Sequence, residues 1–438
     1  MKFDKKQQEA IDLCCNISKR LVAVTGEAGT GKTTIIKEVY NRLLQYIEEN
    51  KRLFTNKEEF YPQDFIALVA PTGKAAKRIY EATGIPAMTI HRLLEYPMPG
   101  EIDEKTGKAL VSSLPKRCKS NPIKQKFVIC DEYAMVNYEL HRNLLDALPR
   151  GGVIRMFGDC NQLEPIEESA YLKDKPSQFQ EMLIRFPSVI LDTIHRQEDG
   201  STIIENSHII NKGLMPKRSD DFLLYFTNST IFPTTVITNL ITKDPEYYTI
   251  NKQIISPSRN SWVGTQKLNL MIQMLRFGHK VDEGYQIERH KWAKPQEFYL
   301  YIGDKVIFTK NNYDLGVFNG ESGIVTDIKL FGDVTIDFGD KVVNIPSSQT
   351  INMYGKSVEY NPQKDIDLAY VITTHKSQGS EYKEITYIID RSLIFMCNRK
   401  NLYTAVTRAR EKVNIITDQK TLMFSLKHVK NPYQVKEK

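Results

Sequence analysis

The residues best suited to chemistry form a glycine-rich stretch near the amino terminus, Gly26-Glu-Ala-Gly-Thr-Gly-Lys-Thr33. It lies between an apolar run, Leu21–Thr25, and a segment with apolar residues at helical spacing, Thr33–Glu48. In that context the glycines let successive backbone N–H groups surround phosphate oxygens, and the helix adds its positive end. Lys32 is predicted to contact the β- and γ-phosphates, and the Thr33 hydroxyl to bind Mg²⁺. The other predicted members of this nucleotide site are Gly26, Ala28, Gly29, Thr30, Gly31 and Thr34.

Two later loops supply the groups that a phosphate site needs. The apolar run Phe127–Cys130 ends in Asp131 and Glu132. Asp131 is predicted to hold the Mg²⁺ through water, and Glu132 to polarise the attacking water. A third apolar run, Val153–Phe157, ends in a polar loop whose Gln162 is placed to bond the γ-phosphate or that water. Three strands that end in such loops favour one shared nucleotide site.

These loops need a parallel sheet to hold them together. Short β-branched runs alternate with longer helical patterns, which predicts an α/β fold with function at the carboxyl ends of the strands. The pattern resumes after residue 195 and predicts a second α/β domain. The predicted strands are Leu21–Thr25, Phe65–Ala70, Phe127–Cys130, Val153–Phe157, Val189–Leu191, Gln253–Ser256, Ala369–Ile372, Ile385–Ile389 and Val413–Ile416.

Two stretches depart from this alternation. Residues 96–122 are polar and rich in proline and glycine, and within them Gly100–Val111 fits either a β-hairpin or a plain surface loop. Residues 321–350 alternate apolar and polar positions between glycines, which predicts a small antiparallel β-module inserted in the second domain.

Length and composition limit the class of protein. A chain of 438 residues predicts two or three domains, and 41% hydrophobic with 26% charged residues is typical of a soluble globular protein. No run approaches the roughly 18 apolar residues that span a bilayer, and the amino terminus has no signal core. The net charge of +7 permits nucleic-acid binding but does not establish it. The six cysteines form no Cys-x-x-Cys pair, so we expect reduced thiols rather than a zinc site.

The motifs together resemble those of superfamily 1 helicases, specifically the RecD/Dda-like 5′→3′ branch (superfamily 1B). The resemblance covers nearly the whole chain in the family's order. Because the first phosphate motif starts at residue 26, the chain in that respect resembles the compact phage Dda-type enzymes. The matching segments are Gln7–Ala10 (motif Q), Gly26–Thr33 (I), Ala70–Lys77 (Ia), Thr89–Leu93 (Ib), Asp131–Met135 (II), Gly158–Pro165 (III), Ile194–Gln197 (IV), Val317–Gly320, Thr373–Glu381 (V) and Tyr403–Arg410 (VI).

The resemblance implies two RecA-like domains in tandem, each interrupted by an insertion. The implied divisions are 1–95 with 123–193 (domain 1A), 96–122 (a pin-like 1B insertion), 194–320 with 362–438 (domain 2A) and 321–361 (an SH3-like 2B insertion). It also implies ATP and Mg²⁺ as cofactors, with Gln7 reading adenine and Gln378 and Gly379 contacting ATP. Arg196 and Arg408 would reach the γ-phosphate, Arg408 as the arginine finger.

The implied partners are single-stranded and forked duplex DNA, with a single-strand binding protein or replisome components as further candidates. The implied strand contacts are Pro71, Thr72, Lys74, His91, Arg92, Asn319, Thr374 and His375. The family further implies a monomer in a bacterial or phage-infected cytoplasm, with no membrane partner. From the residues alone, three alternatives stay open: another P-loop enzyme such as a polynucleotide kinase, a non-catalytic nucleic-acid binding protein, and an RNA rather than DNA motor.

Overall fold

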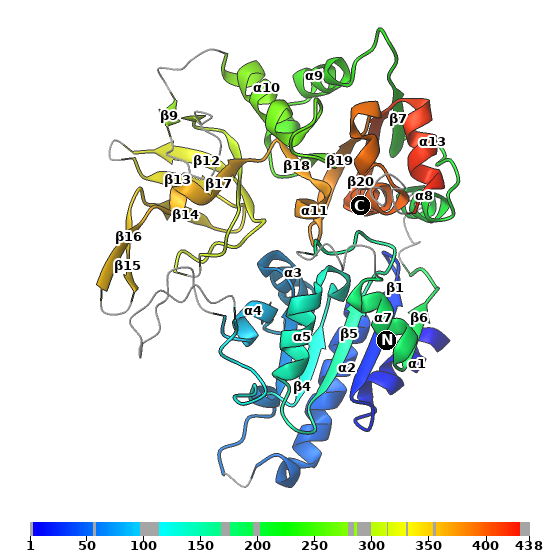
Figure 1. Ribbon diagram of the computed structural model, residues 1–438, viewed down its shortest axis with the longest axis vertical. Coiled ribbons are helices and arrows are strands. Elements are labelled where there is room, and N and C mark those ends of the chain that lie inside the picture. The colour runs from blue at the N-terminus through cyan, green and yellow to red at the C-terminus, as the bar shows by residue number, and fades with distance from the viewer. Residues whose placement is uncertain are drawn as a thin grey trace, which may run out of the picture. The chain divides into compact units, whose positions relative to one another are not determined.

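The computed structural model describes residues 3–55, 58–96, 114–167, 176–195, 202–278, 284–286, 299–312, 314–329, 332–353 and 356–429. The chain divides into two compact units, Met1–Gly200 and Ser201–Lys438, and each contains one parallel sheet with helices (Figure 1). The predicted α/β class is therefore confirmed. The proposed hairpin within 96–122 and the proposed γ-phosphate contact Arg196 lie outside the described residues.

The sheet of the first unit has six parallel strands in the order β3-β2-β4-β5-β1-β6. The pattern of apolar residues predicted strands β1, β2, β4, β5 and β6, and each predicted end lies within one residue of the observed end. The two-residue β3 was not predicted because it is too short to show a period. The strands are β1 (Leu21–Gly26), β2 (Ile66–Ala70), β3 (Met88–Thr89), β4 (Phe127–Cys130), β5 (Val153–Gly158) and β6 (Ser188–Leu191).

Helices cover both faces of this sheet because alternate strand residues point to opposite sides. Val22 and Val24 pack in one core with α1, α2 and α3, whereas Ala23 between them packs in the other with α4, α5 and α7. The helices are α1 (Lys5–Cys15), α2 (Lys32–Glu49), α3 (Gly73–Thr83), α4 (Ile90–Leu93), α5 (Tyr138–Asp146) and α7 (Gln178–Arg185).

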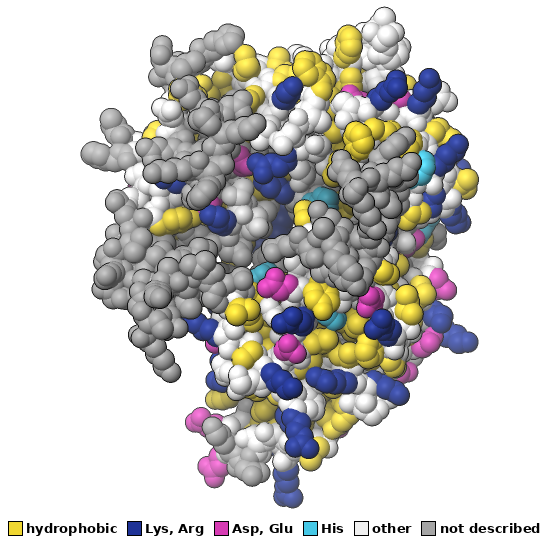
Figure 2. Space-filling view, viewed as in Figure 1, with side chains coloured by type: hydrophobic (Ala, Val, Ile, Leu, Met, Phe, Trp, Pro, Cys, Tyr) yellow, Lys and Arg dark blue, Asp and Glu magenta, His cyan; other side chains and the backbone are white. Residues whose placement is uncertain are grey.

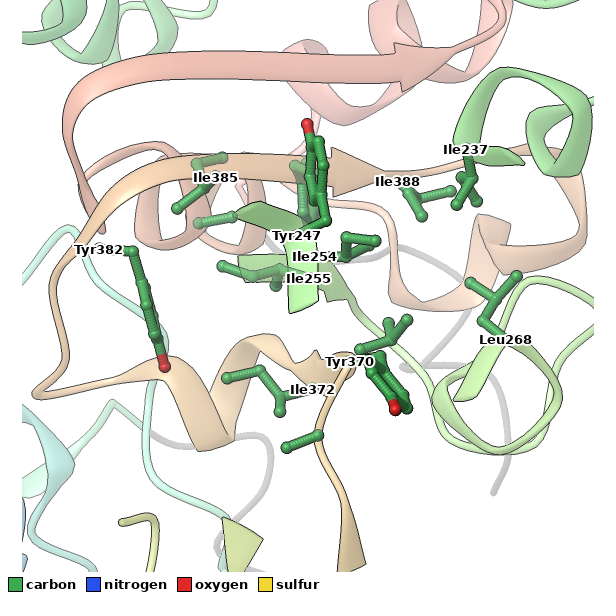
Figure 3. Close-up of a cluster of buried hydrophobic side chains, with 14 of the residues drawn as sticks. Ile237, Tyr247, Ile254, Ile255, Leu268, Tyr370, Ile372, Tyr382, Ile385 and Ile388 are labelled. Atoms are coloured by element: carbon green, nitrogen blue, oxygen red, sulfur yellow. The ribbon is translucent and has the colours of Figure 1, made fainter. Parts of the chain in front are cut away.

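The sheet of the second unit has five parallel strands in the order β18-β8-β19-β20-β7. In its core, Ile254 and Ile255 of β8 lie among side chains from β19 and from helices α9 and α10 (Figure 3). The elements are α8 (Thr202–Asn211), β7 (Phe222–Phe226), α9 (Pro233–Lys243), β8 (Lys252–Ser256), α10 (Thr265–Phe277), β18 (Val371–Thr373), α11 (Thr374–Ser377), β19 (Tyr382–Ile388), α12 (Arg399–Val406), β20 (Ala409–Thr417) and α13 (Gln419–Lys427).

An antiparallel sheet interrupts the second unit, in the order β14-β13-β12-β11-β17. It contains the alternating strands predicted in 321–350, and it also takes in strands on either side of the proposed insertion 321–361. One of these, β11, has all four residues buried and so shows no alternation. The strands are β11 (Lys305–Phe308), β12 (Ser322–Ile328), β13 (Val334–Asp337), β14 (Val342–Ile345) and β17 (Ile366–Leu368), with the separate pairs β9 (Tyr285–Gln286) and β10 (Tyr299–Leu300), and β15 (Gln349–Met353) and β16 (Lys356–Tyr360).

Two side chains near α10 are more exposed than the favoured interpretation of the sequence predicts. Residues 263–276 have apolar residues at helical spacing; Trp262 before them suits either packing at the helix start, which we favoured, or contact with DNA, and Met271 and Met274 suit the core. Instead α10 begins at Thr265, and Trp262 and Met274 are 66% and 50% exposed. The spacing of apolar residues predicted the helix correctly, but it did not determine which side chains at the border of the apolar face are exposed to water.

Charged side chains of both signs are present on the surface, in keeping with the modest net charge of +7. On the face seen in Figure 2, the described Lys and Arg side chains are dispersed among acidic and hydrophobic ones. Across the part of the chain that the structure describes, no helix is both long enough and apolar enough to cross a bilayer.

Candidate nucleotide site and strand-contact residues

The order of strands brings three predicted loops together at one edge of the first sheet. Because β5 lies between β4 and β1, the loop after β5 is flanked by the acidic pair after β4 and the glycine-rich loop after β1. Hydrogen bonds join the loops directly. Asn161 Nδ2 donates to Glu27 Oε1 (2.9 Å), and the Cys160 N–H donates to Thr25 Oγ1 (3.3 Å). The predicted sharing of one site by these loops is therefore sterically feasible.

The glycine-rich loop has the backbone conformation that its sequence predicts. Gly29 and Gly31 have φ values of +85° and +80°, which favour glycine. A Cβ atom on Gly26 would lie 2.5 Å from Thr30 Oγ1, so a side chain there would force the loop to shift. Lys32, the first residue of α2, donates from Nζ to the carbonyl oxygens of Gly26 (2.6 Å) and Glu27 (2.9 Å). Its ammonium group thus lies within the loop.

Helix α1 holds the predicted adenine-reading residue against this loop. Asp4 and Gln7 form a capping box at the start of α1, and Gln7 is 5% exposed. Gln7 Nε2 donates to the carbonyl oxygen of Thr30 (3.2 Å). His195 fixes the same region, because its N–H donates to the Gly29 carbonyl (3.0 Å) and its ring bonds Asp4 (2.6 Å). Motif IV was assigned to the second domain, yet His195 lies in the first unit.

In the acidic pair, Asp131 is buried and Glu132 is partly buried. Burial, together with the charge of Glu132, raises the pKa of Asp131 to about 6, although the Glu132 N–H, Lys32 and Arg78 act to lower it. Glu132 has a left-handed backbone (φ +50°), and Arg78 Nη1 lies 3.8 Å from its Oε1. Among the described residues, Glu132 Oε2 and Gln162 Oε1 are buried without a hydrogen-bond partner.

These features fit Mg²⁺ and a nucleotide. A buried carboxylate with a raised pKa is costly to ionise unless a cation approaches it. The two orphaned oxygens, Glu132 Oε2 and Gln162 Oε1, are acceptors that a bound water would satisfy. Thr33 and Asp131 would hold the metal, and Lys32 with the backbone of the glycine-rich loop would hold the phosphates.

Tyr133, the residue after the acidic pair, is part of the core. Its ring is fully buried against Phe179, at a centroid distance of 6.0 Å, and its hydroxyl bonds His141 Nδ1 (2.9 Å). Burial lowers the pKa of His141 to about 4. Tyr133 therefore packs in the hydrophobic core of the first unit, next to the acidic pair in sequence.

The lowered pKa of His141 makes the stability of the first unit depend on pH. The depressed pKa means that folded His141 stays neutral while the unfolded residue takes up a proton near its ordinary pKa of about 6.5. Its contribution to stability is present above that value and is lost as the pH falls towards about 4. We expect His141→Gln to reduce the acid-induced loss of unfolding free energy by about 2–3 kcal/mol between pH 7 and pH 4. Urea denaturation at each pH measures this, with His428→Gln as the control; equal pH slopes for wild type and His141→Gln would contradict it.

Arg408, the predicted arginine finger, is 3% exposed and hydrogen-bonded within the second unit. Its guanidinium donates to the carbonyl oxygens of Thr404 (3.0 Å) and Ser380 (3.4 Å) and to Thr407 Oγ1 (3.0 Å). It precedes β20, whose first residue pairs with the first residue of β19. Arg408 and Gly379 (φ +71°) therefore lie near the amino ends of strands, not at the carboxyl ends where we expected the site groups. Gln378, which directly precedes Gly379, is buried.

The predicted strand contacts of the first unit are accessible. Thr72 caps α3 by accepting from the Ala75 N–H (3.2 Å), and Pro71 and Lys74 beside it are half-buried. His91 and Arg92 are exposed on α4.

The predicted strand contacts of the second unit differ in their exposure to solvent. Asn319 is exposed and His375 half-buried, but the side chain of Thr374 is completely buried. In this structure, packing at the start of α11 covers the Thr374 hydroxyl, and its contact with a strand stays a prediction.

Three residues of the first unit make long-range contacts that the sequence did not predict. Arg155 looks like an interruption in an apolar strand, His195 like part of a distant motif, and Asn161 like a residue of a solvated turn. Each acts through contacts with residues more than 130 positions away along the chain. Such partners emerge only when the strands are ordered in space.

Comparisons with known proteins agree with this architecture. Residues 7–168 match the family described as AAA domain, and residues 368–416 match the UvrD-like helicase C-terminal domain. The chain is 29% identical over 399 residues to the ATP-dependent RecD2 DNA helicase of Deinococcus radiodurans, covering 90% of this chain and 46% of that protein. It is 25% identical over 480 residues to the RecBCD enzyme subunit RecD of Buchnera aphidicola, covering 95% and 73%. The chain thus spans less than half of the Deinococcus protein.

Solved structures support the fold. Pif1 helicase from Bacteroides in complex with ADP-AlF3 and single-stranded DNA has a TM-score of 0.57 at 21% identity, covering 97% of this chain and 94% of that one. Pif1 helicase from Candida albicans has a TM-score of 0.56 at 18% identity, covering 99% and 98%. The two sheets are accordingly RecA-like. By its motif order and its sequence matches, the chain is similar to the RecD-like helicases of superfamily 1B, and its fold agrees with that similarity.

Proposed function

We propose that the chain is an ATP-dependent DNA helicase that moves 5′→3′ on single-stranded DNA and separates duplex strands. One observation supports it above all. The order β4-β5-β1 groups the glycine-rich loop, the acidic pair and Gln162 at one sheet edge, while a second RecA-like unit carries motifs V and VI. A P-loop enzyme that only transfers phosphate has no use for that second unit.

The roles of the residues follow from their chemistry. Lys32, Thr33 and Asp131 would hold ATP and Mg²⁺, which supply the phosphoryl group and its charge neutralisation. Glu132 would accept the proton of the attacking water, and Gln162 would orient that water. Arg408 would stabilise the charge that develops on the γ-phosphoryl oxygens, once its bonds to Thr404 and Ser380 are exchanged.

We propose that side chains suited to binding phosphates hold the backbone of a single strand. Thr72, Lys74, Arg92 and Asn319 offer hydroxyl, cationic and amide groups that hold a backbone without reading its sequence. His91 and His375 add rings. The Dda-type character, a monomeric state, assistance by a single-strand binding protein and Arg196 as a second γ-phosphate contact remain part of the same proposal.

A strand-displacement assay tests the proposal. Duplexes carrying a 5′ or a 3′ single-stranded overhang, in DNA and in RNA, are incubated with the protein, Mg²⁺ and ATP. We expect displacement of DNA with a 5′ overhang, and none when ATP or Mg²⁺ is left out. Displacement only with a 3′ overhang would reverse the direction, and displacement only of RNA would favour the RNA motor. Labelled phosphate transferred to a strand, without displacement, would favour a kinase.

A further inference from the structure

The loop that joins β8 to α10, residues 257–264, presents a tryptophan to solvent. Trp262 is 66% exposed, although burial of a large aromatic ring ordinarily stabilises a fold by a few kcal/mol. Its neighbour Val263 is fully buried and anchors the loop. The ring is therefore held outside the core by a loop that is itself fixed to the core.

Hydrogen bonds make this loop rigid. Ser256 Oγ, at the end of β8, donates to the Val263 carbonyl (2.8 Å), and the Gly264 N–H donates to the Ser261 carbonyl (3.0 Å). The Thr265 N–H reaches back to the Ser258 carbonyl (3.0 Å). A ring on such a support loses little conformational entropy when it binds a ligand.

The loop is also fixed relative to motif V. Ser256 pairs with Thr373, so the carboxyl ends of β8 and β18 lie side by side, and Thr373 opens motif V. Asn269 of α10 joins the two segments, because its side chain accepts from the Val371 N–H (2.7 Å) and donates to the Leu368 and Val371 carbonyls (3.1 and 2.9 Å). Figure 3 shows Leu268 of α10 and Tyr370 in the same core beside Ile254.

Positive charges accompany the ring. Lys267 Nζ lies 4.5 Å from the centroid of the Trp262 ring, which is a cation–π contact. Arg259, 54% exposed, and Lys376 of motif V both approach Asp367, at 3.9 and 3.7 Å. Lys267 thus lies against the ring, and Arg259 of the same loop shares the carboxylate of Asp367 with Lys376 of motif V.

We propose that Trp262 is a base-stacking contact for single-stranded nucleic acid, with Lys267 and Arg259 holding the adjacent phosphates. An aromatic ring can stack on any base of such a strand, because every base has a π-face, and nearby cations can bind the negatively charged phosphodiester groups. The inference rests on the proposed function and extends the strand-contact surface of the second unit beyond motif V.

The chain offers a direct spectroscopic test. It has two tryptophans, Trp262 and Trp292, so Trp292→Phe leaves Trp262 as the single indole fluorophore. That variant is titrated with fluorescein-labelled oligothymidine, with anisotropy of the label reporting binding, and with unlabelled oligothymidine for indole emission. We expect quenching that follows the binding curve. An abasic oligonucleotide of the same length, which keeps the phosphates, should bind without this quenching.

Alanine substitution gives the second measurement. In the otherwise wild-type protein, Trp262→Ala is expected to weaken binding of oligothymidine about 5- to 100-fold, as loss of one stacked base does, and Trp262→Phe to restore most of it. Phe232→Ala, at another exposed aromatic of the second unit, is the matched control and should leave binding unchanged. Binding with unquenched Trp262 emission, or unchanged affinity in Trp262→Ala, would overturn the stacking contact alone. Absence of any anisotropy change would overturn the proposed function as well.

Discussion

Replacing Lys32 with alanine is expected to lower ATP hydrolysis by at least about 10²–10³-fold and to abolish strand displacement. The Lys32 ammonium lies within the glycine-rich loop, where it contacts two loop carbonyls. In the proposed function it is the cation of motif I that would contact the β- and γ-phosphates, so its removal would withdraw charge stabilisation from the transition state. Binding of a single strand should stay measurable, because none of the proposed strand contacts depends on Lys32.

The measurements are ATP turnover with and without oligothymidine, oligothymidine binding by anisotropy, and strand displacement. Lys37→Ala is the matched control, since Lys37 lies on the exposed side of the same helix α2. It should leave all three measurements near those of the wild type. Normal strand displacement by the Lys32→Ala protein would refute the use of this site as the source of energy.

Replacing Arg155 with methionine is expected to destabilise the first unit by about 3–5 kcal/mol. Arg155 is fully buried in β5, and its guanidinium donates to the carbonyl oxygens of Cys14, Asn16 (3.0 Å) and Lys19 (2.8 Å). Cys14 is in the last turn of α1, where carbonyl groups lack partners within the helix. Methionine fills a similar volume but leaves these buried acceptors unpaired.

Urea denaturation followed by circular dichroism and hydrogen exchange of the α1 amides measure the effect. Arg42→Met is the control, because Arg42 makes only partly exposed ion pairs with Glu38 and Asp12 and should change stability by less than about 1 kcal/mol. Since α1 carries Gln7, we also expect nucleotide binding by Arg155→Met to weaken before the unit unfolds. A stability equal to that of Arg42→Met would show that α1 needs no such anchor.

The sequence by itself determined the elements and the chemistry of each loop. Buried parallel strands such as Val153–Gly158 are short apolar runs, and their period and flanking polar residues are local properties that a sequence displays directly. The glycine-rich loop is also local, because its φ values and its lysine belong to eight consecutive residues. The α/β class and the conformation of the glycine-rich loop were therefore predictable.

Only the tertiary structure decided which of these residues are neighbours. That β5 separates β4 from β1, that His195 bonds the glycine-rich loop, and that Arg155 caps α1 all depend on strand order and on contacts across more than 130 residues. Side-chain exposure was decided there too, since Thr374 is buried and Trp262 is not. The reason is physical: burial and long-range hydrogen bonds are properties of packed surfaces, and the period of a single segment does not specify the surface that will cover it.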